Sequence, residues 1–117
     1  MVFSYTKADR ILKRPEFLKL SKHGMKIHSK HFLAIFCPGR YERIRLGITV
    51  TKKIGGAVTR NRIKRFSREF FRLNKHSVAG NWDINIIAKK NAASLTSDQA
   101  FLSLQNIFNK ISRNFDY

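Results

Sequence analysis

The chain has 117 residues, of which 43% are hydrophobic, and this is enough for one core in a single domain over residues 1–117. Its 24 Lys and Arg residues face only seven Asp and Glu residues. The net charge of +17 calls for a polyanionic partner, with nucleic acid the first candidate and an anionic membrane the second. No apolar run approaches the roughly 18 residues of a transmembrane helix, and Met1–Arg10 lacks the apolar stretch of a signal peptide. We therefore expect a cytoplasmic protein.

The first half of the chain predicts a short helix followed by two or three strands, two of which can be located. Pro15 suits the first turn of the helix, and Gly24 ends it. One strand covers about residues 31–37, and its Cys37, the single cysteine, is expected to pack in the core. The second strand, residues 43–51, alternates apolar and polar residues, which is typical of a half-buried antiparallel strand with a polar face.

The second half predicts a helix over about residues 58–75, a strand over residues 82–88 and a last helix in which Thr96 and Gln99 form a capping box. The residues expected to be buried in the two helices are Ile63, Phe66, Phe70, Leu73, Phe101, Leu104, Phe108 and Ile111. This order of elements indicates an α/β two-layer sandwich with helices packed on a small mixed sheet.

The helix over residues 58–75 carries cations on the face opposite its apolar stripe. The set comprises Arg60, Arg62, Lys64, Arg65, Arg68 and Arg72, with Asn61 among them and Lys52 and Lys53 in the preceding segment. Solvated helix faces normally mix charges, because like charges four residues apart cost a few tenths of a kcal/mol, yet only Glu69 offsets this set. Arginine matches phosphate geometry, so the pattern favours a phosphate-binding face over a solvated one.

A specific resemblance lies in residues 51–72, which read TKKIGGAVTRNRIKRFSREFFR. This stretch resembles the signature of the protein subunit of bacterial ribonuclease P, whose centre is an Arg-Asn-Arg motif followed by Lys-Arg. The resemblance extends to residues 46–50, 22–24 and 86–90 and to the length of the chain. It implies the ribosomal protein S5 domain 2-like fold with a left-handed crossover, where handedness statistics alone favour a right-handed one.

The resemblance also implies a function, that of the protein cofactor of an endoribonuclease. In this family the large RNA subunit and the magnesium ions it holds remove the 5′ leader of precursor tRNA, and one protein per RNA binds both the RNA subunit and the leader. The chain is then expected to hold no metal and no catalytic side chain of its own. The residues implied to bind RNA are Lys52, Lys53, Arg60, Asn61, Arg62, Lys64, Arg65, Arg68, Arg72, Lys89 and Lys90.

In the family the leader lies in a cleft between the first helix and the sheet. The residues expected to line this cleft here are Lys13, Phe17, Phe32 and Ile35. Two positions depart from the family pattern, since Ser21 replaces a frequent aromatic residue and Ile35 stands where some members have tyrosine. Because stacking on a ring contributes roughly 1–3 kcal/mol per base, leader contacts should be weaker here or shifted onto neighbours such as Phe36. Phe17 is open to either reading, as a cleft residue or as an ordinary core residue.

Catalysis by the protein itself is a poor fit to the sequence. The seven acidic residues are scattered with no close pair, whereas a metal-dependent nuclease needs clustered carboxylates. The four histidines have no evident orienting carboxylate, and with Cys37 they do not make a zinc site. Two alternatives remain: a ribosomal or other structural RNA-binding protein, and a basic protein acting on anionic membranes. Only the ribonuclease P subunit explains the order of lysines, glycines and the Arg-Asn-Arg motif.

Overall fold

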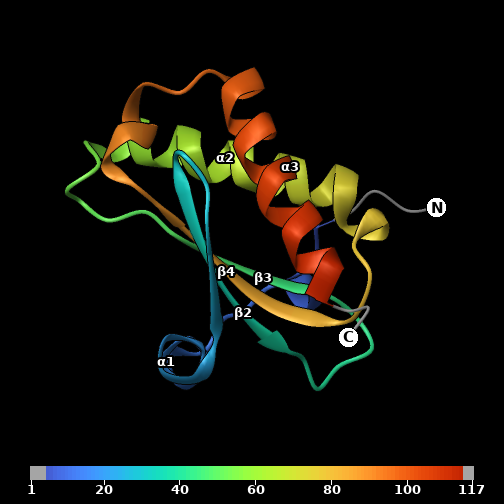
Figure 1. Cartoon of the computed structure of the whole chain (residues 1–117). Helices are drawn as coiled ribbons and strands as arrows, with labels where there is room; N and C mark the ends of the chain where they lie inside the picture. Colours follow the sequence, from blue (N-terminus) through green and yellow to red (C-terminus); the bar gives the residue numbers. More distant parts are fainter. Residues whose placement is uncertain (1–4, 115–117) are drawn as a thin grey trace.

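The computed structural model describes residues 5–114 (Figure 1). Its elements in chain order are the 3₁₀ helix η1 (Lys7–Asp9), α1 (Arg14–His23), β1 (Met25–His28), β2 (Phe32–Pro38), β3 (Arg45–Thr49), α2 (Ala57–Asn74), η2 (Lys75–Ser77), β4 (Trp82–Ala88), η3 (Lys90–Ser94) and α3 (Ser97–Asn114). Residues 1–4, part of the segment from which a signal peptide was excluded, lie outside the described residues. Within residues 5–114, no helix combines the length and apolar character needed to span a bilayer.

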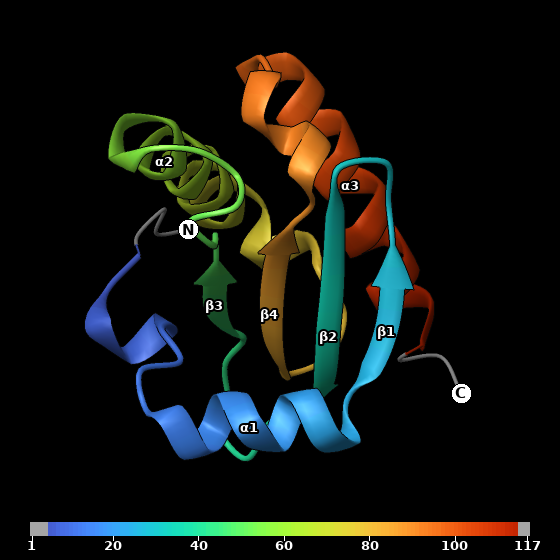
Figure 2. The ribbon, with the colours of Figure 1, turned by 90° about the vertical axis from the view of Figure 1, so that its left-hand side faces the viewer.

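Four strands form one mixed sheet in the order β1-β2-β4-β3. The pairs β1–β2 and β2–β4 are antiparallel, and β3 runs parallel to β4. Helices α2 and α3 pack on one face of this sheet, and α1 lies across the other face (Figure 2). The expected class, helices packed on a small mixed sheet, is confirmed. Three strands follow α1, as the sequence allowed, and β1 is the one that the sequence did not locate.

The crossover from β3 through α2 to β4 is left-handed. In Figure 2, which views the sheet from the α1 side, β3 and β4 both point upward and β4 lies to the right of β3. Helix α2 packs on the opposite face of the sheet from α1. A chain that moves to the right through a helix on the far face winds left-handed, against the usual preference. The handedness implied by the family resemblance is therefore present.

Strand β3 differs from the sequence expectation in two respects. It pairs in parallel with β4, not antiparallel. Its polar face is also covered, since Arg45 is only 8% exposed and a Cβ on Gly47 would lie 2.5 Å from Cε1 of Phe17 on α1. Alternation of apolar and polar residues reports the burial of one face. It contains no information on the direction of the neighbouring strand or on a helix that covers the other face.

The core side of α2 is rotated relative to the expected stripe. Ile63 and Phe70 are buried and Phe66 packs against the core, as expected, but Leu73 is 40% exposed. Phe71 takes its place, because it makes edge-to-face ring contacts with Tyr5, at 5.7 Å, and with Phe108 of α3. The expectation for Leu73 was therefore wrong.

Helix α3 buries Leu104, Phe108 and Ile111 as expected. Phe101 is only partly buried, and Ile107, which the sequence analysis did not select, is fully buried. Cys37 is half-buried on the α1 side of the sheet, outside the main core. Its pKa is raised by burial, so the thiol form is favoured.

The two predicted helix-end signals have different physical causes. The capping box at the start of α3 is confirmed: the Gln99 N–H donates to Thr96 Oγ1 at 3.2 Å, and the Thr96 N–H donates to Gln99 Oε1 at 3.0 Å. Gly24 follows the last residue of α1, but its φ is −73°, a value open to any residue. Glycine is needed there for space, because a Cβ would lie 2.5 Å from Cγ2 of Ile35.

Candidate nucleic-acid interface

The first three turns of α2 carry the cationic surface. Burial of Ile63 and Phe70 against the sheet fixes the rotation of the helix, and this turns the cations away from the core. Asn61, Arg65 and Arg68 are exposed, whereas Arg60, Arg62 and Lys64 are half-buried. Among the described residues, Arg65 and Arg68 have no carboxylate partner. The two arginines are therefore available to phosphates.

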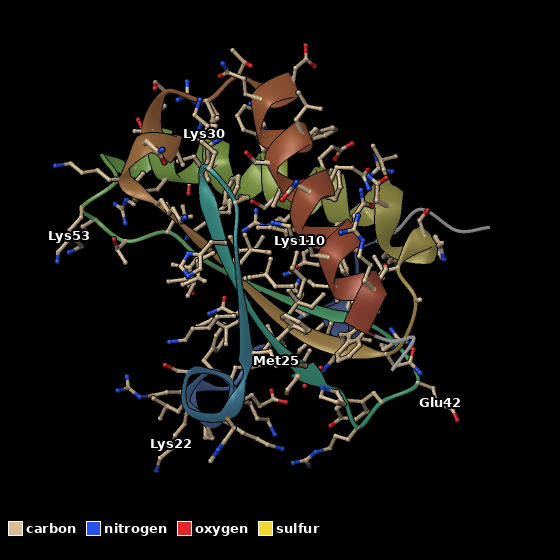
Figure 3. The ribbon with its side chains drawn as sticks, viewed as in Figure 1. Lys22, Met25, Lys30, Glu42, Lys53 and Lys110 are labelled. Atoms are coloured by element: carbon tan, nitrogen blue, oxygen red, sulfur yellow. The ribbon has the colours of Figure 1, made fainter. Side chains whose placement is uncertain are left out.

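Lys52 and Lys53 lie in the exposed segment that leads into α2. Figure 3 shows Lys53 pointing away from the protein beside the start of this helix, while Lys22 lies far from it near α1. Ile54 is buried and anchors the segment between the lysines and the helix. The arrangement places both lysines next to the N-terminus of α2, where backbone N–H groups also favour anions.

Arg62 is held by the protein itself. Its Nη2 donates a hydrogen bond to the backbone carbonyl of Ala93 in η3, thirty-one residues further along the chain. The Nε atoms of Arg60 and Arg62 are buried and have no hydrogen-bond partner among residues 5–114. Arg62 therefore links α2 to η3 as well as adding positive charge, a role that its position in the sequence motif did not reveal.

Arg72 differs from the other cations of α2, because it forms an ion pair with Glu69 one turn earlier. The hydrogen bond from Arg72 holds the pKa of Glu69 below its ordinary value. Glu69, the acid that interrupts the cationic face, is thus paired with Arg72, the last arginine of that face. The four-residue spacing alone could not distinguish Arg72 from Arg68.

The segment that follows β4 adds further cations near the start of α2. Lys89 Nζ donates to the carbonyl of Ser29 at 2.7 Å, and Asn91 Nδ2 donates to the carbonyl of Lys30 at 2.9 Å. These bonds join η3 to the turn between β1 and β2. Lys90 and Lys30 are exposed. Lys30 lies at this end of the molecule, which could not be predicted from local patterns because the two turns are about sixty residues apart in the chain.

The expected leader-binding residues do not form one surface. Phe32 has no exposed area and belongs to the main core on the α2 side of the sheet, so its assignment to the cleft was wrong. Ile35 points to the α1 side, but it is only 5% exposed beneath that helix. Phe17 is half-buried above Gly47, and Lys13 is exposed just before α1. Phe17 therefore combines packing against the sheet with some exposure to solvent.

The sheet face beside Phe17 is formed by residues that the sequence analysis missed. Cross-strand pairing places Leu33 next to Ile87, and Ile87 next to Thr49. All three side chains are partly exposed. Strand alternation could have found Leu33, because Phe32, Ala34 and Phe36 face the main core and the residues between them must face the α1 side.

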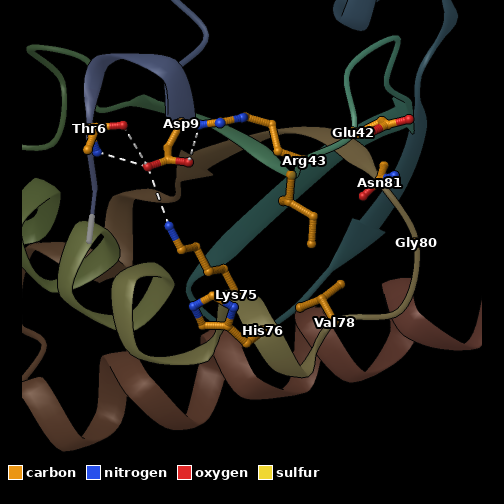
Figure 4. A pocket seen from close by; sticks show the side chains of 10 residues that line it. Thr6, Asp9, Glu42, Arg43, Lys75, His76, Val78, Gly80 and Asn81 are labelled. Carbon is orange, nitrogen blue, oxygen red and sulfur yellow. Dashed lines mark hydrogen bonds and ion pairs between the residues drawn. The ribbon is translucent and has the colours of Figure 1, made fainter. Parts of the chain in front are cut away.

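A polar cavity of about 540 Å³ lies at the other end of α2 (Figure 4). Its buried Asp9 accepts hydrogen bonds from the Thr6 N–H and hydroxyl and from Arg43 and Lys75. Burial raises the pKa of Asp9, but the Thr6 bonds and the Lys75 charge outweigh it and hold the pKa below its ordinary value. The carboxylate thus ties η1 to the end of α2 in its charged form.

The remaining candidates for acid-base or metal chemistry do not gather into a site. Within residues 5–114, no three His, Cys, Asp or Glu side chains lie close enough to hold a metal ion. His31 Nδ1 lies 2.7 Å from Ser103 Oγ. The pKa of His31 is lowered by burial and by the Lys30 and Lys89 charges, so its imidazole is neutral near pH 7.

Comparison with known proteins places this geometry in a family. The family model described as "Ribonuclease P" matches residues 5–112. The chain is 50% identical over 110 residues to the ribonuclease P protein component of Desulfatibacillum aliphaticivorans, which covers 94% of this chain and 93% of the relative. It is 51% identical over 113 residues to that of Desulfosudis oleivorans, with coverage of 97% and 93%.

Solved structures agree. The RNase P protein of Staphylococcus aureus superposes with a TM-score of 0.84 at 37% identity, covering 93% of this chain and 99% of that chain. The RNase P protein of Thermotoga maritima gives a TM-score of 0.81 at 31% identity, with coverage of 87% and 96%. The motif on α2, the fold and these matches together show that the chain belongs to the ribonuclease P protein family.

Proposed function

We propose that this chain is the protein subunit of ribonuclease P, that it binds the RNA subunit of that endoribonuclease through α2, and that it helps to remove the 5′ leader of precursor tRNA. The observation that carries the proposal is the surface of α2, where the exposed Asn61, Arg65 and Arg68 meet almost no negative charge. Phosphate contacts of this kind supply sequence-independent affinity for RNA. Family membership supplies the identity of the RNA.

The precursor leader is the second proposed ligand. Phe17, Leu33, Ile87 and Thr49 offer an apolar sheet face beside α1, and unpaired bases bind such faces through stacking and apolar contact. Lys89 and Lys90 lie just beyond the end of β4, where they can screen the leader backbone. Mature tRNA has no leader and cannot contact this face. The complex should therefore bind precursor tRNA more tightly than mature tRNA.

The protein's part in the reaction is positioning and charge screening. Two polyanions, the RNA subunit and the substrate, repel each other, and cations placed between them reduce that cost. The family resemblance assigns the magnesium ions to the RNA subunit, so we derive no step through a metal held by the protein. A ratio of one protein per RNA and a cytoplasmic location stay predictions.

Reconstitution tests this function. The purified chain is mixed with a bacterial ribonuclease P RNA at low magnesium concentration, and cleavage of a precursor tRNA is followed. We expect faster cleavage than with the RNA alone, and tighter binding of precursor than of mature tRNA. RNA binding without any gain in cleavage would instead support a structural RNA-binding protein. Lys22→Ala is the control for variants of the α2 surface such as Arg65→Ala, because Lys22 is exposed on α1 far from α2.

A further inference from the structure

A second cavity, lined mainly by basic residues, lies at the start of α1. Its volume is about 550 Å³, and it is enclosed by η1, the start of α1 and the loop before β3. Arg45, the first residue of β3, lines it, whereas Thr49 on the proposed leader face is the last residue of the same strand. The cavity therefore lies at the opposite end of β3 from Thr49, although it shares Arg43 with the cavity around Asp9 and Lys13 with the cleft expected from the sequence.

The charge inside this cavity is strongly positive. Lys7, Arg10, Lys13, Arg43 and Arg45 line it together with a single acid, Glu16. Glu16 is already paired with Arg45, which also binds Asp83 at 2.8 Å, and Arg43 is paired with Asp9. Within residues 5–114, Lys7, Arg10 and Lys13 have no carboxylate partner. Three cations thus line the cavity without an ion pair, although the charge of Lys13 acts on Glu16 and the Arg10 guanidinium carbon lies 5.0 Å from the centre of the Tyr5 ring.

The cavity also has an aromatic wall. The Tyr41 side chain is 48% exposed, and the Arg45 guanidinium carbon lies 4.6 Å from the centre of its ring. Arg45 is itself fixed by Glu16 and Asp83, so the ring rests on a rigid support. Leu12, 52% exposed, adds an apolar patch to the same wall. Because the ring is already held in place, the protein loses little conformational freedom when a base stacks on it.

We propose that this cavity binds one nucleotide of unpaired RNA, with the base stacked on Tyr41 and the phosphate held by Lys7, Arg10 and Lys13. The inference rests on the proposed function for its RNA partners. An aromatic face with phosphate-binding cations beside it matches a nucleotide whose base is free to leave a stack. Paired RNA presents mainly phosphates and sugars, and it would leave the Tyr41 ring unused. The nucleotide can belong to the distal part of the leader or to the RNA subunit.

Tyr41→Ala and Tyr41→Phe test the aromatic contact in the reconstituted complex. Binding is measured for precursor tRNAs with short and with long leaders, and for assembly of the protein with the RNA subunit. We expect Tyr41→Ala to weaken binding at least about fivefold in one of these assays, and Tyr41→Phe, which keeps the ring, to behave like the wild type. A loss confined to long leaders assigns the nucleotide to the leader, and a loss in assembly assigns it to the RNA subunit.

Lys7→Ala tests the phosphate contact without touching the ring. In the same assay it should reduce the slope of log affinity against log salt by roughly 0.7, the value for one contact with a single strand. The exposed Lys22 at the end of α1 is the matched control, and Lys22→Ala should leave the slope unchanged. Circular dichroism checks that each variant is folded. If Tyr41→Ala does not fold, the salt slope of Lys7→Ala decides whether the cavity binds RNA.

The proposal is overturned if Tyr41→Ala binds every RNA like the wild type, or if Tyr41→Phe loses as much affinity as Tyr41→Ala. A wild-type protein that fails to stimulate cleavage would reject the proposed function but not the cavity. In that case the free protein is titrated with an unpaired oligoribonucleotide and with a duplex of the same length. A shift of the Tyr41 ring protons in NMR spectra with the unpaired strand alone supports the site, and no shift removes it.

Discussion

Arginines that look equivalent in the sequence of α2 have different roles at the scale of single residues. Arg62 donates to the Ala93 carbonyl and is half-buried. Arg65, one turn away, is exposed and has no partner among the described residues. Arg72 is paired with Glu69. An arginine that is hydrogen-bonded within the protein also stabilises the fold. Replacing such a residue should therefore change both stability and RNA binding, whereas replacing an arginine without a partner should change RNA binding alone.

Arg62→Ala and Arg65→Ala are a matched pair for this separation. Arg62→Ala should lower the free energy of unfolding by about 1 kcal/mol, because a half-buried charged hydrogen bond is lost, and it should also weaken RNA assembly. Arg65→Ala should leave stability unchanged and reduce the salt slope of RNA binding by roughly one unit. Urea unfolding and binding at several salt concentrations measure the two effects. Equal unfolding free energies for the two variants would remove the structural role of Arg62.

At the scale of elements, α1 is attached to the sheet by apolar contacts and by one buried charge cluster. Leu20 and Phe17 pack on Ile35 and its neighbours. Arg45 of β3 binds Asp83 of β4 and Glu16 of α1, so it joins all three elements. The hydrogen bonds to Asp83 and Glu16 raise the pKa of Arg45, so the guanidinium stays charged at any relevant pH. The position of α1 should therefore depend on the ionisation of Glu16, the residue of α1 that binds Arg45.

The pH dependence of unfolding tests this attachment. The hydrogen bond from Arg45 lowers the pKa of Glu16 in the folded protein below its ordinary value of 4.5. The resulting stability is fully present above that ordinary value and is lost as the pH falls through the lower folded-state pKa. Glu16→Gln should cost roughly 1–2 kcal/mol near neutral pH and flatten the decline in acid.

Urea unfolding between about pH 6 and pH 3 measures this decline. Part of it should persist in Glu16→Gln, because the pKa of Asp9 is also lowered in the folded protein. Glu42→Gln is the control, since Glu42 is exposed and has no ion pair within residues 5–114. A Glu16→Gln profile parallel to that of the wild type would show that Glu16 does not contribute to the attachment of α1 through its charge.

At the scale of the whole molecule, the net charge of +17 is spread over a body with a radius of gyration of 13.2 Å. Self-repulsion at this charge density destabilises the compact state. The five ion pairs within residues 5–114 use four of the seven acids and four of the 24 Lys and Arg residues, so few positive charges are balanced by a neighbouring acid there. An RNA partner, or simple salt, should relieve the repulsion.

Thermal unfolding in salt tests this balance. Raising the ionic strength from about 0.1 M to about 1 M shortens the Debye length from about 10 Å to about 3 Å. We expect Tm to rise by several degrees, roughly 4 °C for each kcal/mol gained, while affinity for RNA falls. Sodium sulfate at equal ionic strength separates anion binding from general screening. A fall in Tm with salt would show that the ion pairs contribute more to stability than the repulsion costs.

The sequence determined most of the elements and the chemistry of α2. Apolar periodicity placed α2, β4 and α3 within a few residues, because burial of one face is written into local spacing. The cations of α2 and the shortage of acids indicated a phosphate-binding face for the same reason, because charge and its order along a helix are local properties. The family resemblance then supplied the topology and the identity of the RNA.

The tertiary structure decided which neighbours those elements acquire. Strand alternation puts Phe32 and Leu33 on opposite sides of β2, but only the packing of α2 and α3 on one side and α1 on the other decided that Phe32 is the buried one. The parallel direction of β3, the link from Arg62 to Ala93 and the cavity beside Tyr41 all join residues distant in the chain. Such contacts depend on how layers pack, and local periodicity carries no record of them.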